Sequence, residues 1–125
     1  MKLENISKNI KLTTARKAIL ERLIESNKPL CYEDIKDSLS MDKATFYRNI
    51  TKFEDEDIIT SFESNDKKRY YEIINNKHPH FICTNCSKIE CIHEPISIDL
   101  KGYKIDNIII KGICPKCLKI QKENR

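Results

Sequence analysis

Two pairs of cysteines with metal-ligand spacing are the first chemistry that the sequence offers. Cys83 and Cys86 form one C-x-x-C pair, and Cys114 and Cys117 form a second. Each pair can present two thiolates from one tight turn, and four thiolates complete the tetrahedral shell of a structural Zn²⁺. Two disulfides or one redox-active pair are the alternatives. A reducing compartment disfavours disulfides, and a redox pair would leave the other pair unexplained, so we predict a structural zinc.

All three histidines of the chain lie near a further cysteine. The candidate ligands are Glu72, His78, His80, Cys91 and His93. A His-x-His pair on a strand places both imidazoles on one face, where they can share a metal ion. We therefore predict a second, regulatory metal site. The alternative is that the histidines are ordinary solvated or core residues and that Cys91 is a buried strand residue. Imidazole with thiolate suits Zn²⁺ better than Mn²⁺, and we expect Zn²⁺ or Fe²⁺.

One predicted helix, over residues 43–55, has the surface of a DNA-reading element. Asp42 is a suitable N-cap, and an apolar stripe should face the core. The stripe is Phe46, Ile50 and Phe53; the opposite face carries Ala44, Arg48, Thr51 and Lys52, with Lys43 and Tyr47 at its border. Small side chains flanked by Arg, Thr and Lys can enter a major groove and reach bases and phosphates. The alternative is an ordinary solvated face.

The segments around this helix predict a winged helix-turn-helix. A first helix, capped by Thr13 or Thr14, should end before Pro29. A second short helix is predicted from the apolar positions Cys31, Ile35 and Leu39. After the third helix, strands over residues 58–64 and 67–73 should form a hairpin, a wing that touches DNA phosphates. Its predicted tip carries Lys67, Lys68 and Arg69.

From residue 76 onward the pattern changes from helical to extended. Ile96, Ile98 and Leu100 alternate with polar residues, Lys101–Gly102 marks a turn, and residues 103–110 supply more strand. A small sheet clamped by zinc would compensate for a thin core. The predicted fold class is therefore α+β, with a winged helix-turn-helix DNA-binding domain over residues 1–75 and a zinc-clamped, β-rich domain over residues 76–125.

The composition limits the class of protein. The chain has 125 residues, of which 39% are hydrophobic and 34% charged, with two glycines and a net charge of +4. No apolar run approaches the roughly 20 residues that cross a bilayer, and no signal peptide is visible. We expect a cytoplasmic protein without a membrane partner. Two glycines leave no room for a phosphate-binding glycine loop, and we expect a protein that is not an enzyme.

Several motifs occur in the order found in one family of bacterial transcription factors. They are Lys11–Arg16 with Ile19–Leu20, Ala44–Asn49, Arg69–Glu72, His78–Lys88 and Gly112–Cys117. The second resembles the Ala-Thr-Val-Tyr-Arg recognition helix of the ferric uptake regulator family. The fourth resembles the histidine-rich run that leads into the Cys-x-x-Cys-Gly-Lys of the same family. The resemblance covers about residues 11–117 and extends to the iron, zinc, peroxide, manganese and nickel sensors of this family.

The resemblance implies roles for individual residues. Cys83, Cys86, Cys114 and Cys117 match the structural zinc site, and Glu72, His78 and His80 match ligands of the sensing site, to which we add Cys91 and His93. Tyr47 and Arg48 match DNA-contacting positions. The full expected DNA-binding set is Lys11, Arg16, Lys43, Thr45, Tyr47, Arg48, Thr51, Lys52, Lys67, Lys68 and Arg69. The resemblance also implies a homodimer, in which the second domain is the dimerisation domain.

The sequence departs from the family pattern at several positions. Pro29, with Cys31 nearby, stands where the family usually has a histidine before its second helix. Cys91 stands where some members have an acidic ligand, and Pro79 separates His78 from His80 where Asp is common. The segment between Cys91 and Gly112 is too short for the helix that usually lies between the dimerisation strands.

We therefore expect a metal-responsive transcriptional regulator, a repressor of metal-homeostasis or stress genes, that binds a double-stranded DNA operator. It would hold one structural Zn²⁺ and a second divalent ion at the regulatory site. One alternative is a DNA-binding member with structural zinc only, which does not sense metal. A remote alternative is a thiol–disulfide redox protein that uses Cys83 and Cys86.

Overall fold

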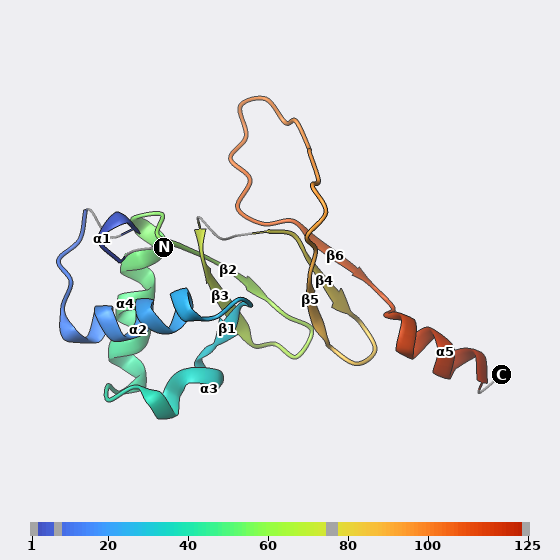
Figure 1. Cartoon of the computed structure of the whole chain (residues 1–125), viewed down its shortest axis with the longest axis horizontal. Helices are drawn as coiled ribbons and strands as arrows, with labels where there is room; N and C mark the ends of the chain where they lie inside the picture. The colour runs from blue at the N-terminus through green and yellow to red at the C-terminus, as the bar shows by residue number, and fades with distance from the viewer. Residues whose placement is uncertain (1–2, 7–8, 75–77, 124–125) are drawn as a thin grey trace. The chain divides into compact units, whose positions relative to one another are not determined.

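The computed structural model describes residues 3–6, 9–74 and 78–123 (Figure 1). The described chain forms two compact units. The first contains the residues up to 62 together with 69–74, and the second contains residues 63–68 and 78–123. The predicted domain boundary at residues 75 and 76 lies outside the described residues.

The first unit begins with two helices, α1 (Leu3–Ile6) and α2 (Thr14–Glu25). Thr13 caps α2, as predicted, because its Oγ1 accepts a hydrogen bond from the backbone N–H of Arg16 at 3.2 Å. The helix ends at the C-cap Ser26, before Pro29, which confirms the predicted end.

The next segment differs from the prediction of a helix that contains Cys31. Leu30–Cys31 forms strand β1, in which Cys31 pairs with Tyr70, and the helix α3 (Tyr32–Ile35) begins only afterwards. The Asp34 carboxylate accepts a hydrogen bond from the Cys31 N–H at 3.0 Å, which fixes the helix start at Tyr32. A 3-10 turn (Lys36–Ser38) follows, and Leu39 is already extended. Pairing with a distant strand therefore outweighed the local helical periodicity.

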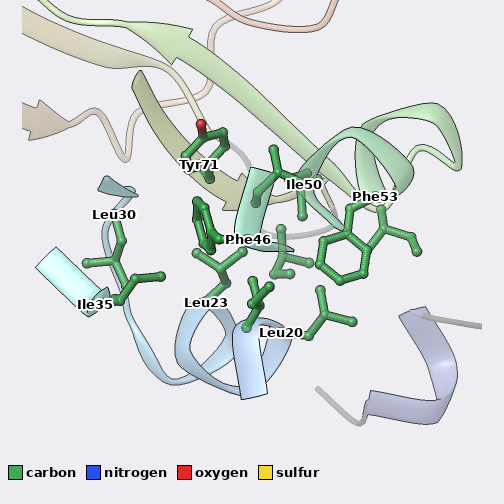
Figure 2. Close-up of a cluster of buried hydrophobic side chains, with 12 residues drawn as sticks. Leu20, Leu23, Leu30, Ile35, Phe46, Ile50, Phe53 and Tyr71 are labelled. Carbon is green, nitrogen blue, oxygen red and sulfur yellow. The ribbon is translucent and has the colours of Figure 1, made fainter. Parts of the chain in front are cut away.

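Helix α4 (Lys43–Asp55) has the predicted bounds. Asp42 caps it, because its Oδ1 accepts a hydrogen bond from the Thr45 N–H at 2.9 Å, and hydrogen bonds from Thr45 lower the pKa of Asp42. The predicted stripe of Phe46, Ile50 and Phe53 is buried. Figure 2 shows these side chains packed with those of α2, α3, β1 and β3 in one apolar core.

A three-stranded sheet belongs to the first unit, except for residues 63–68 at the end of its hairpin. Strands β2 (Ile59–Glu63) and β3 (Arg69–Ile73) form the predicted hairpin, and the strand order is β1-β3-β2. Both strands are shorter than predicted because the turn is wider, with Lys67 at a positive φ of 65°. Lys67 and Lys68 lie in this turn, and Arg69 begins β3. Helices followed by such a hairpin make a winged helix-turn-helix, as predicted.

The second unit contains a small mixed sheet and a terminal helix. Its elements are β4 (His80–Cys83), β5 (Ile89–Cys91), β6 (Ile109–Gly112) and α5 (Pro115–Glu123). The strand order is β5-β4-β6, with β4 antiparallel to β5 and parallel to β6. The α+β fold class is therefore confirmed. None of the helices in the described part of the chain is long and apolar enough to cross a membrane.

Of the two strands predicted between the cysteine pairs, the one at residues 96–100 is absent, and the one over residues 103–110 forms only at its end, where Ile109 and Ile110 begin β6. Residues 92–108 form no strand, and only the turn at Lys101–Gly102 is present, with Gly102 at a φ of 83°. The alternating apolar residues of this segment are exposed, Leu100 by 52% and Tyr103 by 74%. An alternating pattern becomes a strand only where a neighbouring strand pairs with it along its length, and here such pairing is confined to residues 109–112, which join β4.

Candidate metal sites and DNA-binding surface

The four predicted zinc ligands come together in the second unit. Cys83 ends β4, Cys86 lies in the turn before β5, and Cys114 and Cys117 flank the start of α5. Parallel pairing of β4 with β6 places Cys83 beside Gly112, which joins the two pairs in space. The four Sγ atoms lie within 4.8 Å of one another, and those of Cys86 and Cys114 are 3.9 Å apart. None of the six cysteines forms a disulfide.

This four-cysteine group fits a tetrahedral zinc ion. Zn–S bonds of about 2.3 Å place the sulfurs of such a site about 3.8 Å apart, close to the separation of Cys86 and Cys114. Gly112 allows the close approach, because a Cβ there would lie 3.3 Å from the Phe81 ring. The group could therefore bind zinc with small side-chain adjustments.

Backbone amides prepare one of these sulfurs for metal binding. The N–H groups of Cys86 and Cys114 each donate to the Sγ of Cys83 at 3.4 Å, which lowers the pKa of Cys83 to about 6. Asn85 lowers the pKa of Cys117, but burial and the three neighbouring thiols raise it to about 11. Four thiolates in one place repel one another, so their joint ionisation requires a cation such as Zn²⁺.

A second group of metal-binding side chains lies in the same unit. The ligand atoms of His78, His80 and Cys91 lie within 4.8 Å of one another. The ring of His78 is also 5.4 Å from the ring of His93, centroid to centroid, in a stacked arrangement. The structure thus brings three of the five predicted ligands together and places a fourth beside them. Glu72 belongs to the first unit, where it is buried on β3.

The face of α4 that points away from the apolar core is exposed. Arg48 and Thr51 are exposed, and Tyr47 is 37% exposed. The ammonium group of Lys43 lies 5.6 Å from the ring centre of Tyr32 and 5.9 Å from that of Tyr47, which holds a cation at the N-terminal end of the helix. Lys52 is half-buried and pairs with Glu56 at 3.2 Å, so it is less available than predicted.

Arg16 has a structural role that sequence reasoning missed. Its Nε donates to Asn49 Oδ1 at 3.0 Å, and its Nη1 donates to the Lys11 carbonyl at 2.9 Å. Asn49 in turn donates to the Thr45 carbonyl at 3.0 Å. Arg16 therefore connects α2 to α4 and helps to position α4. The only signal for Asn49 was its place directly after Arg48 in the Ala44–Asn49 motif.

The three predicted wing residues, Lys67, Lys68 and Arg69, differ in whether other side chains hold them in place. Arg69 donates through Nε to Ser61 Oγ at 3.0 Å, and Ser61 donates to Glu54 at 3.1 Å. Lys67 and Lys68 are exposed in the turn. In the same segment, Asn65 donates to the carbonyl of Thr84, within the first C-x-x-C pair, at 3.0 Å. The two lysines are thus the more available cations of the three predicted wing residues.

Comparisons with known proteins agree with this architecture. The model of the ferric uptake regulator family matches residues 7–110. A peroxide operon regulator of Bacillus subtilis is 30% identical, over 92% of this chain and 88% of its own. A ferric uptake regulation protein of Bordetella parapertussis is 31% identical, over 88% of this chain and 91% of its own.

A solved structure shows the same fold. The ferric uptake regulator of Helicobacter pylori superposes with a TM-score of 0.72 at 22% identity, over 94% of this chain and 95% of its own. The order of the motifs in this chain, its winged helix-turn-helix and the family match all point to the same family. The chain belongs to the ferric uptake regulator family of metal-responsive transcriptional regulators.

Proposed function

We propose that this protein is a DNA-binding transcriptional repressor whose affinity for its operator depends on a metal ion. Cys83, Cys86, Cys114 and Cys117 hold a structural Zn²⁺. A second divalent ion binds at His78, His80 and Cys91 and acts as the signal. The protein works as a homodimer, so that two copies of α4 enter successive major grooves of a double-stranded operator.

The observation that carries this proposal is the presence of two separate metal-donor groups in a chain with a winged helix-turn-helix. One group of four thiols is sufficient for a structural ion. A structural ion does not need the second group, because the four thiols of the same unit already supply its complete set of ligands. A second ion that binds one domain arrangement more tightly would shift the protein toward the arrangement that fits DNA.

The first test is the metal dependence of DNA binding. The probe is double-stranded DNA selected from a random library by the metal-loaded protein. We expect protein with both ions to bind it about 5- to 150-fold more tightly than protein with structural zinc alone, the usual range of allosteric coupling. A double variant, His78→Ala with His80→Ala, should bind equally with and without the added ion. If this variant keeps the metal dependence, the sensing site lies elsewhere.

The second test is the role of Arg48 in reading DNA. Arg48 is exposed on the outward face of α4, and loss of an arginine–base contact costs about 1–3 kcal/mol. Arg48→Ala should therefore weaken binding to the selected DNA about 5- to 150-fold at fixed salt, measured by fluorescence anisotropy. Arg22→Ala is the matched control, because Arg22 is an exposed residue of α2 that pairs with Glu25 at the surface. Equal losses in both variants would indicate a general charge effect and contradict the assigned role.

A further inference from the structure

Two tyrosines and one lysine form a cluster at the N-terminal end of α4. The cluster consists of Tyr32 from α3 and of Lys43 and Tyr47 from α4, and all three belong to the first unit. The Lys43 ammonium lies over both rings, 5.6 Å from the centre of Tyr32 and 5.9 Å from that of Tyr47. Both distances are within the roughly 6 Å range of a cation–π interaction.

The two rings of this cluster are themselves fixed by contacts with buried residues. The ring centre of Tyr32 lies 4.8 Å from that of Phe46, which is fully buried, and 5.7 Å from that of Tyr47. The hydroxyl group of Tyr47 shares a hydrogen bond with that of Tyr71, a buried residue of β3. The rings therefore keep their orientation, and the ammonium group meets a preformed aromatic surface.

Tyrosine rings hold a lysine without neutralising its charge. The other lysine of α4, Lys52, pairs with the Glu56 carboxylate at 3.2 Å, which offsets its charge. Lys43 is exposed and is attracted instead by the electron-rich faces of neutral rings. The carboxylate of the adjacent Asp42 accepts a hydrogen bond from the Thr45 N–H. The cluster thus presents a cation at a fixed place with its charge available to an anionic ligand.

The position of Lys43 on the helix indicates which anion it meets. Lys43 and Tyr47 are four residues apart, so they lie at one border of the exposed face that carries Arg48. When a helix enters a major groove, the middle of its outer face reaches base edges, and its borders meet the phosphates that line the groove. The compact charge of a lysine suits a contact with phosphate.

We propose that Tyr32 is a positioning residue for DNA binding, which together with Tyr47 holds the Lys43 ammonium where it meets a DNA phosphate. A free lysine side chain loses much rotamer freedom when it binds a ligand, and a lysine that is already held loses less. Tyr32 lies outside the predicted DNA-binding set and acts through Lys43. This inference rests on the proposed function, because it concerns how the same helix binds DNA.

The salt dependence of DNA binding tests the phosphate contact of Lys43. The probe is the double-stranded DNA selected with the metal-loaded protein, and its affinity for the full chain is measured at several salt concentrations. Lys43→Gln should weaken binding and reduce the slope of log affinity against log salt by about 0.9 for each bound chain. Lys28→Gln is the matched control, because Lys28 is an exposed lysine outside the predicted DNA-binding set, and it should leave the slope unchanged.

A double-mutant cycle tests the role of Tyr32. Tyr32→Leu should weaken DNA binding about two- to fivefold, because loss of an exposed cation–π pair lowers the population of the held lysine by that factor. Tyr32→Phe keeps the ring and should bind like the unmodified chain. In the Lys43→Gln background, Tyr32→Leu should have no further effect, because the ring then has no ammonium group to hold. Circular dichroism of each variant checks that the fold is kept.

A measurement without DNA tests the cluster itself. The methylene protons next to the Lys43 ammonium should have NMR signals shifted upfield by the ring currents of the two tyrosines. Tyr32→Leu should reduce this shift, and Tyr32→Phe should preserve it. A shift that is the same in Tyr32→Leu would mean that Tyr32 does not hold the lysine, and it would overturn the inference whatever the DNA affinity.

The outcomes separate this inference from the proposed function. An unchanged salt slope in Lys43→Gln, or equal effects of Tyr32→Leu in both backgrounds, overturns the inference, since a purely structural role of Tyr32 would act in both. If Arg48→Ala still weakens binding in that case, the proposed function stands without it. If neither Arg48→Ala nor Lys43→Gln changes the affinity for DNA, the inference and the proposed role of α4 are both wrong.

Discussion

Removal of zinc from the four-cysteine group should unfold the second unit while the winged helix-turn-helix stays folded. The buried side chains around this group are those of Cys83, Cys114 and Cys117, with Phe81 and Ile113 only partly buried against them. Such a core contributes little hydrophobic stabilisation. A structural Zn²⁺ contributes about 10–16 kcal/mol in zinc-finger peptides, as much as or more than the whole free energy of unfolding of a typical domain.

Amide NMR spectra before and after treatment with a strong chelator measure this effect. The signals of β4, β5, β6 and α5 should collapse to unfolded positions, and those of α2 and α4 should remain dispersed, because the first unit has its own apolar core. Cys114→Ser should give the same result without chelator. Cys91→Ser is the control, since its thiol lies outside the four-cysteine group, and it should stay folded. A second unit that remains folded after elemental analysis shows no zinc would contradict the structural role.

Truncation of Phe46 should be the most damaging single change in the first unit. Phe46 is fully buried, and its ring centre lies 4.8 Å from that of Tyr32, 5.1 Å from Tyr47 and 6.0 Å from Tyr71. Phe46→Ala removes these contacts and leaves a cavity, at an expected cost of about 3–5 kcal/mol in the free energy of unfolding. The neighbouring Tyr47 should lose its fixed position, so DNA affinity should fall as well.

Urea unfolding followed by circular dichroism measures the loss in stability. Phe46→Leu is the matched variant, because it keeps most of the apolar volume and should cost clearly less. Tyr47→Phe is a second comparison, since it keeps the ring and removes only the hydroxyl, which has a side-chain hydrogen bond with Tyr71; it should cost about 0.5–1.5 kcal/mol, less than Phe46→Ala. A loss below about 1 kcal/mol in Phe46→Ala would mean that the neighbouring side chains collapse into the cavity.

Elements with local signals could be predicted from the sequence. The N-caps Thr13 and Asp42 and the bounds of α4 follow from hydrogen bonds and periodicity within a few residues of each other. The C-x-x-C spacing likewise identified the cysteine pairs, because two thiols on one tight turn are adjacent in any fold. The burial of Phe46, Ile50 and Phe53 was predictable for the same reason.

Elements that depend on a distant partner could not be predicted in this way. Cys31 follows a helical pattern but pairs with Tyr70, and residues 92–108 contain an alternating apolar pattern but form no strand. The contact of Arg16 with Asn49 joins residues 33 positions apart, which no local pattern encodes. In each case the outcome depended on which other segment was close in space.

The sequence by itself determined the family of this protein, the residues that can serve as metal donors, and the bounds and buried face of α4. Only the tertiary structure decided how the ligands are grouped. The parallel β4–β6 pairing joins the two cysteine pairs, and the antiparallel β4–β5 register sets His80 opposite Cys91. Strand register is the reason, because a shift of one residue would turn every one of these side chains to the other face.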